Sequence, residues 1–268
     1  MIRLQNVRKT FRSARVLDGI SLEVGLGERI ALIGSNGAGK TTLIRCLLGE
    51  YTFDGSVSIS GLDPRTNRTV VLGKIGFVPQ LPPPLKMPVG QLIDFSASLC
   101  GTDPQRIHDI AKRLGLDVDA ILSRQFVRLS GGMKQKLLIA IALGRDAQVL
   151  VMDEPTTALD VTIQGQILDI IKNLQKKNQT SVIMITHDLG VVANIAQKIA
   201  VMYSGIIVES GTCEDIFYRP RHPYTWALIR SVPRLDLKNK QELATIPGTP
   251  PDLLNPPVGC PFCTRCSY

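Results

Sequence analysis

Gly34-Ser-Asn-Gly-Ala-Gly-Lys-Thr-Thr42 is the stretch of sequence that decides the fold. It follows the apolar run Arg29–Ile33, which we predict to be a buried strand, and it precedes Leu43–Leu48, which we predict to be a helix. A glycine-rich loop between a strand and a helix is the context in which this pattern cradles phosphates. Its backbone N–H groups and the positive end of the helix dipole attract a polyanion. The chain is therefore predicted to bind a nucleotide.

The side chains of this loop have separate predicted roles. Lys40 places a positive charge on the phosphates, and the Thr41 hydroxyl is a candidate ligand of Mg²⁺. Gly37 and Gly39 let the backbone approach the phosphates where a Cβ atom would obstruct it. The predicted nucleotide-binding set in the loop is Ser35, Asn36, Gly37, Ala38, Gly39, Lys40, Thr41 and Thr42.

Composition narrows the class of protein. With 44% hydrophobic side chains and alternating strand and helix patterns, the chain is predicted to form one α/β core with appendages. No apolar stretch reaches the roughly 20 residues that cross a bilayer. The N-terminal residues lack the apolar segment of a signal peptide, so we expect a cytoplasmic protein. The net charge of +8 is scattered, which favours a solvated basic surface over a nucleic-acid site.

Strand and helix patterns alternate along most of the chain. Between Val89 and Leu122 the pattern is helical, and Asp103-Pro104 predicts the start of a helix over 104–115. Prolines prevent a helix over 81–88, and the chain becomes proline-rich after Gly211. Strands are predicted at Ile2–Leu4, Leu17–Val24, Arg29–Ile33, Val57–Ser60, Lys74–Gln80, Val149–Met152, Ser181–Ile185 and Ile199–Met202.

The segment Val149–Glu154 predicts the acidic half of the nucleotide site. Four apolar residues end in two carboxylates, as expected of a buried strand that delivers acids to one edge of a sheet. Asp153 is expected to hold Mg²⁺, and Glu154 to polarise the attacking water. Adjacent strand residues point to opposite faces, which suits two roles. A strand ended by solvated acids is the alternative, and the P-loop argues against it.

A second glycine-rich segment is more specific. Ser130 beside Gly131 and Gly132 at a helix N-terminus would form a second anion-binding nest. The chain resembles the ATP-binding cassette (ABC) transporter ATPases over essentially its whole length, in the order of its motifs: the P-loop, Gln80, Leu129-Ser-Gly-Gly-Met133, Asp153-Glu154, Ala158-Leu-Asp160 and His187.

This resemblance implies the fold and the domain organisation. The fold would be α/β: a P-loop NTPase (RecA-like) core with an antiparallel β subdomain, an inserted helical subdomain and a proline-rich C-terminal extension. Residues 1–211 would form the ABC ATPase domain, with the helical subdomain at about 85–145. Residues 212–268 would form the extension.

The resemblance also implies a dimer that shares its nucleotides. Ser130, Gly131 and Gly132 would contact the γ-phosphate of ATP bound by an opposite subunit, so that two chains sandwich two nucleotides. Asp160 would lie in the loop that aligns this dimer. The partner would be an identical chain or a related ABC ATPase.

Three further residues acquire roles from the same resemblance. Gln80 would touch Mg²⁺ and water and would relay contact with membrane subunits. His187 would contact the γ-phosphate and support Glu154. Phe11 would stack on adenine, with packing inside the protein as its alternative.

The last third of the chain resembles a particular group of importers. His222–Leu228, Ile246–Cys266 and Thr156–Gln164 are similar to segments of oligopeptide, dipeptide and nickel importer ATPases. In that group the terminal cysteines would ligate an iron–sulfur cluster. Cys260 and Cys266 match its pattern, whereas Cys263 stands where the group has another residue. A zinc site and an unliganded, reduced tail are the alternatives.

The other three cysteines, Cys46, Cys100 and Cys213, are isolated in the sequence. We predict them to be buried thiols, separate from any metal site.

We therefore expect an ATP-hydrolysing subunit that drives import of oligopeptides, dipeptides or nickel across the cytoplasmic membrane. The first half, with its Ser35-Asn-Gly-Ala sequence and its short stretch between Gln80 and Leu129, looks more like ATPases of drug or antibiotic exporters. The alternatives are therefore an exporter ATPase, or an engineered splice with its seam near 153–160. A soluble ABC protein that acts on ribosomes or DNA is disfavoured because the chain has one P-loop.

This interpretation also predicts the cofactors, the partners and the location of the chain. The cofactors would be ATP and Mg²⁺. The partners would be integral membrane permease subunits and, for an importer, an extracytoplasmic substrate-binding protein, with no nucleic acid. The chain would lie at the cytoplasmic face of the cell membrane.

Overall fold

A computed structural model describes residues 1–156, 159–231, 246–254 and 257–268. Contacts between residues divide the chain into two units. The first unit consists of Met1, Val24–Arg29 and Thr66–Ile185, and the second of Ile2–Glu23, Ile30–Arg65 and Thr186–Tyr268. Each unit is described by itself.

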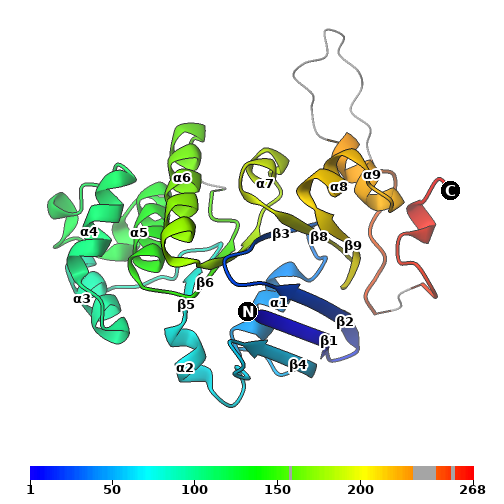
Figure 1. The fold of residues 1–268 in the computed structure, drawn as a ribbon, viewed down its shortest axis with the longest axis horizontal. Helices are drawn as coiled ribbons and strands as arrows, with labels where there is room; N and C mark the ends of the chain where they lie inside the picture. Colours follow the sequence, from blue (N-terminus) through cyan, green and yellow to red (C-terminus); the bar gives the residue numbers. More distant parts are fainter. Residues whose placement is uncertain (157–158, 232–245, 255–256) are drawn as a thin grey trace, which may run out of the picture. The chain divides into compact units, whose positions relative to one another are not determined.

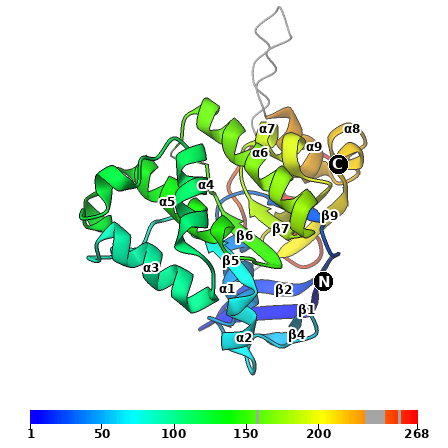
Figure 2. The same ribbon diagram turned by 60° about the vertical axis from the view of Figure 1, so that its left-hand side comes forward.

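The first unit is built on three parallel strands. β5 (Ile75–Val78) and β7 (Ser181–Ile185) both pair with β6 (Val149–Asp153), which therefore lies between them (Figure 2). Every residue of β6 and β7 is buried. Parallel strands that are covered on both faces are continuous apolar runs, which is why the sequence predicted these two strands to within one residue.

Helices of the first unit begin at residues suited to that position. Asp103 accepts a hydrogen bond from the Gln105 backbone N–H and is followed by a proline, so α4 starts where the sequence predicted. Helices α3 and α4 each pack against α5 (Figure 2). The helices are α2 (Arg68–Gly73), α3 (Val89–Cys100), α4 (Pro104–Arg113), α5 (Gly131–Gly144) and α6 (Val161–Asn178), with short 3-10 turns η1 (Asp119–Ile121) and η2 (Phe126–Arg128).

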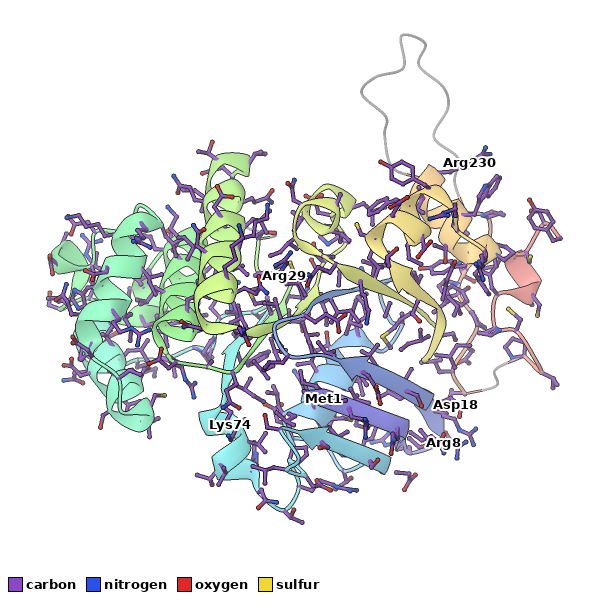
Figure 3. The ribbon with its side chains drawn as sticks, viewed as in Figure 1. Met1, Arg8, Asp18, Arg29, Lys74 and Arg230 are labelled. Carbon is purple, nitrogen blue, oxygen red and sulfur yellow. The ribbon has the colours of Figure 1, made fainter. Side chains whose placement is uncertain are left out.

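The second unit contains an antiparallel sheet in the order β2–β1–β4. Its strands are β1 (Ile2–Phe11), β2 (Ala14–Val24) and β4 (Asp54–Ile59). In β1 the side chains of Ile2 and Leu4 are buried and their neighbours are exposed, the alternation of a sheet with one covered face. Arg8 and Asp18 lie close together on this sheet, with 3.4 Å between Nε and Oδ1 (Figure 3). Both side chains are half-exposed, so this ion pair adds little stability.

A second group of strands in this unit carries the nucleotide loop. β8 (Lys198–Tyr203) pairs with β3 (Arg29–Ile33) in parallel and with β9 (Ile206–Thr212) in antiparallel (Figure 1). The remaining helices are α1 (Lys40–Leu47), α7 (Leu189–Ile195), α8 (Cys213–Tyr218) and α9 (Pro223–Arg230), with the 3-10 turn η3 (Cys263–Arg265).

The hydrophobic core of the second unit includes the C-terminal residues. Phe262 is buried in one cluster with side chains of β3, α7, β8, α8 and α9. Ile246 and Cys266 pack against the same cluster. Residues more than 200 positions from β3 in the sequence therefore help to bury it.

The prediction for the isolated cysteines is correct for one and wrong for two. Cys46 is fully buried, and burial raises the pKa of its thiol to about 11. Cys100 and Cys213 are only partly buried. Each lies at an end of its helix.

Within the described residues, none of the helices combines the length and the apolar character that a membrane crossing requires.

Phe126 and Phe95 offer a matched test of the core of the first unit. Phe126 is fully buried, whereas Phe95 on α3 is 53% exposed. Phe126→Ala is expected to lower the free energy of unfolding by about 3–5 kcal/mol, since it removes buried contacts and leaves a cavity. Phe95→Ala should change it by about 0.5 kcal/mol or less. Urea denaturation measures both values, and equal losses in the two variants would contradict this core.

Candidate functional site

The backbone of the loop between β3 and α1 is fixed by close contacts in the second unit. Gly34 has φ 148°, and a Cβ atom there would lie 2.1 Å from the Met202 carbonyl oxygen, so no other residue fits. The Ala38 N–H donates to the Ser35 carbonyl at 3.2 Å, and the Ala38 carbonyl accepts from the Gly205 N–H at 3.1 Å. The predicted strand–loop–helix context is confirmed, with α1 beginning at Lys40.

Lys40 brings a positive charge into this loop. Its side chain is only 8% exposed, and Nζ donates to the carbonyl oxygens of Gly34 at 2.8 Å and Ser35 at 3.0 Å. Removal of an ammonium from water strengthens its attraction to a bound anion. This geometry suits the predicted role of Lys40 as a phosphate ligand.

Asp153 ends the central strand of the first unit, Glu154 follows it, and both residues are buried. Asp153 is the last residue of β6. Glu154 lies beyond the strand with φ 50°, and its N–H donates to the Ile185 carbonyl at 3.0 Å. The alternation of faces that we expected of two strand residues is therefore wrong for Glu154, because the chain turns sharply there. A left-handed conformation at a residue other than glycine costs about 1–3 kcal/mol and occurs preferentially at functional sites.

The glycine pair after Ser130 opens α5 as predicted. Ser130 Oγ accepts from the Met133 N–H at 3.3 Å, which caps the helix. Ser130 and Gly131 are exposed, and a Cβ atom on Gly131 would meet no atom within 4 Å. The start of α5 is therefore at the surface of the unit at Ser130 and Gly131.

Three other predicted residues lie at the ends of secondary-structure elements. Gln80 is exposed, two residues after β5. Asp160 caps α6, with its Oδ1 accepting from the Ile163 N–H at 2.9 Å. His187 is exposed and precedes Asp188, which caps α7. The capping of α6 is a structural role for Asp160 that the sequence analysis missed.

Phe11 lies in an aromatic pair at the end of β1. Its ring is 39% exposed and meets the ring of Tyr51 edge-on, with 5.1 Å between centroids. Lys9 Nζ lies 4.8 Å from the centroid of Phe11. Phe11 therefore packs on Tyr51 and keeps part of its ring exposed. Tyr51 was missed because it is 40 residues away in the sequence.

The predicted residues divide between the two units. The P-loop, Phe11 and His187 lie in the second unit. The first unit holds Gln80, Ser130, Gly131, Gly132, Asp153, Glu154 and Asp160. The donors predicted for Mg²⁺ on Thr41, Gln80 and Asp153 are a hydroxyl, an amide and a carboxylate oxygen, and these suit a hard cation.

The C-terminal cysteines do not fit a metal site as they are placed. Cys260 and Cys263 are exposed, Cys266 is partly buried, and all three are free thiols. Cys260 Sγ lies 3.7 Å from His222 Nε2. In the described part of the chain, no three His, Cys, Asp or Glu side chains gather in a way that could hold a metal ion. Iron–sulfur and structural zinc sites require four ligands.

One contact to the loop was absent from the sequence prediction. The Ser35 N–H donates to the hydroxyl oxygen of Tyr224 at 2.8 Å. Tyr224 belongs to α9, in a segment whose sequence indicated only a resemblance to importer tails. The two residues are 189 positions apart, so no local pattern could have revealed the contact.

Two family models match the chain. The ABC transporter model matches residues 17–157, and the model described as the oligopeptide/dipeptide transporter C-terminal region matches residues 208–268. These matches confirm the predicted resemblance.

Curated relatives match nearly the whole chain. The oligopeptide transport ATP-binding protein OppD of Bacillus subtilis is 41% identical over 274 residues, which cover 95% of this chain and 76% of OppD. The dipeptide transport ATP-binding protein DppD of the same organism is 38% identical over 290 residues, which cover 99% of this chain and 86% of DppD. Each of these relatives thus aligns with both halves of the chain, including residues 153–160, where a splice was the alternative.

Solved structures share the fold. An ATP-binding subunit of an ABC transporter aligns with a TM-score of 0.75 at 23% identity, covering 81% of this chain and 91% of that one. A bacterial Atm1-family ABC exporter with ATP bound also gives a TM-score of 0.75, at 27% identity. The alignment covers 84% of this chain and 41% of the exporter chain. The expected α/β P-loop fold with an antiparallel β subdomain is confirmed.

Lys40→Ala is expected to weaken ATP binding about ten- to a hundredfold, because a charge-assisted hydrogen bond contributes about 1.5–3 kcal/mol. Lys112→Ala, on the exposed face of α4, is the matched control and should bind as the unchanged protein does. Equilibrium dialysis with labelled ATP measures both. Unchanged affinity in Lys40→Ala would contradict the assigned role.

His222 makes the stability of the second unit depend on pH. Its Nδ1 accepts from the Tyr224 N–H at 3.1 Å, which requires the neutral ring. Burial lowers the pKa of His222, although Glu209 opposes the shift. Below the unfolded value of about 6.5 the unfolded chain binds the proton first, so stability falls as pH falls.

The control for this pH effect is His222→Asn, which can cap α9 and does not titrate. From pH 7.5 to about pH 5.5 the unchanged protein should lose stability relative to this variant, as measured by urea denaturation. A difference in stability that stays constant over this range would contradict the role of His222.

Proposed function

Because this chain belongs to the ATP-binding proteins of ABC transporters, we propose that it hydrolyses ATP to drive import of oligopeptides or dipeptides across the cytoplasmic membrane. The observation that carries the proposal is that one chain matches both the ABC transporter model, over residues 17–157, and the oligopeptide/dipeptide transporter C-terminal region, over residues 208–268. Peptides are favoured over nickel because the relatives described above are named for oligopeptide and dipeptide transport.

The P-loop holds the triphosphate in this proposal. Its N–H groups and the start of α1 surround the β- and γ-phosphates, and Lys40 neutralises their charge. The Thr41 hydroxyl and the oxygens of Gln80 and Asp153 would hold Mg²⁺, which supplies charge neutralisation to the phosphates. The half-exposed ring of Phe11 stacks on adenine.

Glu154 acts on the attacking water. The water oxygen forms a bond to the γ-phosphorus while the bond from that phosphorus to the β–γ bridging oxygen breaks, which releases ADP and phosphate. The carboxylate of Glu154 accepts the proton of the water. His187 contacts the γ-phosphate and supports Glu154. Glu154 is buried, which limits the access of bulk water to its carboxylate.

A second ATPase subunit completes each nucleotide site. Ser130, Gly131 and Gly132 contact the γ-phosphate of ATP bound by the partner, and the exposure of Ser130 and Gly131 supports this role. Asp160 would lie in the loop that aligns the two subunits of the dimer. The partner is an identical chain or a related ABC ATPase.

The remaining partners follow from the importer proposal. Permease subunits span the membrane, an extracytoplasmic protein delivers the peptide, and this chain works at the cytoplasmic face. Residues 1–211 form the ATPase domain, with a helical subdomain at about 85–145. Residues 212–268 form a proline-rich extension, a boundary supported by the family model that begins at residue 208.

Glu154→Gln is expected to bind ATP normally and to hydrolyse it at least about a hundredfold more slowly, since general base catalysis contributes about 10²–10⁴ in rate. Glu214→Gln, at an exposed position of α8, is the matched control and should retain full activity. Phosphate release measures turnover. Full hydrolysis by Glu154→Gln would remove Glu154 from its role.

The same variant identifies the transporter. Tagged Glu154→Gln, expressed in the native cell and purified in ATP, should retain its membrane partners because the closed complex persists. Recovery of peptide-permease subunits would support import. Recovery of exporter-type membrane subunits would overturn it.

A further inference from the structure

A side chain from the C-terminal part of the second unit, the phenol of Tyr224, contacts the nucleotide loop. The hydroxyl oxygen of Tyr224, in the first turn of α9, accepts from the Ser35 N–H at 2.8 Å. We propose that Tyr224 is a positioning residue of the P-loop, and that Phe262 in the cysteine-bearing tail holds Tyr224 in place. The tail thereby sets the affinity of the loop for ATP. This inference rests on the proposed function, because it assumes that the loop binds ATP.

The peptide group that Tyr224 contacts is held from several directions. Lys40 Nζ donates to the carbonyls on both sides of the Ser35 N–H, at 2.8 Å to Gly34 and 3.0 Å to Ser35. The Ser35 carbonyl also accepts from the Ala38 N–H at 3.2 Å. Tyr224 thus accepts from the N–H of Ser35, and the carbonyl of the same residue accepts from Lys40 and Ala38. These bonds fix the first turn of the loop, and a loop fixed beforehand loses less freedom when a ligand binds.

Tyr224 is itself held rigidly. Its side chain is 1% exposed. The ring lies 4.5 Å from that of Tyr203 and 5.4 Å from that of Phe262, measured between centroids. Its backbone N–H donates to His222 Nδ1, which fixes the start of α9. The position of the hydroxyl is therefore set by its surroundings.

The phenol is also in the protonated form over the physiological range. Burial raises the pKa of Tyr224, although the hydrogen bond from Ser35 opposes the shift. A neutral hydroxyl accepts the Ser35 hydrogen bond without placing a negative charge beside a phosphate-binding loop.

The tail is fastened to the same aromatic cluster. Phe262 is buried and meets Tyr203 edge-on at 5.4 Å. Arg265 donates from Nη1 to the Tyr203 hydroxyl at 3.1 Å, from Nε to the Pro247 carbonyl at 2.6 Å and from Nη2 to the Ile246 carbonyl at 3.1 Å. A continuous set of contacts thus runs from the segment 260–266 through Phe262 and Tyr224 to Ser35.

Tyr224→Phe tests the proposal, because it keeps the ring and removes the hydroxyl. We expect the Kd for ATP and the KM for ATP to rise about three- to tenfold, with kcat changed by about twofold or less, as for the loss of one hydrogen bond. Tyr218→Phe is the matched control. It removes the hydroxyl of an 82% exposed side chain at the end of α8, and it should leave Kd within about twofold.

Two further measurements separate a positioning role from a merely structural one. Hydrogen exchange in the nucleotide-free protein should be faster in the peptide containing Ser35 in Tyr224→Phe, but not in Tyr218→Phe. Phe262→Leu should raise the Kd for ATP in the same direction as Tyr224→Phe, and it serves as the test if Tyr224→Phe does not fold.

The outcomes are distinct. Normal ATP affinity and normal exchange at Ser35 in Tyr224→Phe would overturn the inference while leaving the proposed function intact. An unaltered Kd in Phe262→Leu would overturn the part of the inference that concerns the tail. If the unchanged protein does not bind or hydrolyse ATP, the proposed function fails, and this inference fails with it.

Discussion

The structure depends on one constraint: a loop of backbone N–H groups must keep a fixed shape around a highly charged ligand. Gly34 fits only because it lacks a Cβ atom, since the Met202 carbonyl occupies that space. Met202 lies on β8, which pairs with β3, the strand that leads into the loop. The packing of these strands therefore sets the shape of the loop, and Lys40 supplies the charge within it.

Sequence reasoning succeeded where the pattern is local. The strands β3 and β7 were predicted to the residue, because buried parallel strands are unbroken apolar runs. The helix start at Asp103-Pro104 follows from capping chemistry. The loop, the two acids at the end of β6 and the Ser130 segment were all identifiable because their chemistry requires particular residues at fixed spacing.

The features that the sequence did not predict depend on contacts between distant residues. The left-handed turn at Glu154 follows from how the chain leaves β6, which residue type does not reveal. The burial of Cys46 but not of Cys100 reflects packing around each helix. Tyr224 belonged to a segment recognised by resemblance alone, and its contact with Ser35 joins residues 189 positions apart. The fold class and the positions of these motifs relative to strands and helices were therefore predictable, and the contacts that support the nucleotide loop were not.

The central claim is that this chain powers peptide import, and uptake of a labelled peptide by intact cells tests it most directly. Cells that lack the chain should fail to accumulate a radiolabelled oligopeptide or dipeptide. The unchanged protein should restore uptake, whereas Lys40→Ala should not. Normal peptide uptake without the chain, by cells shown to have no second transporter for that peptide, would contradict the account.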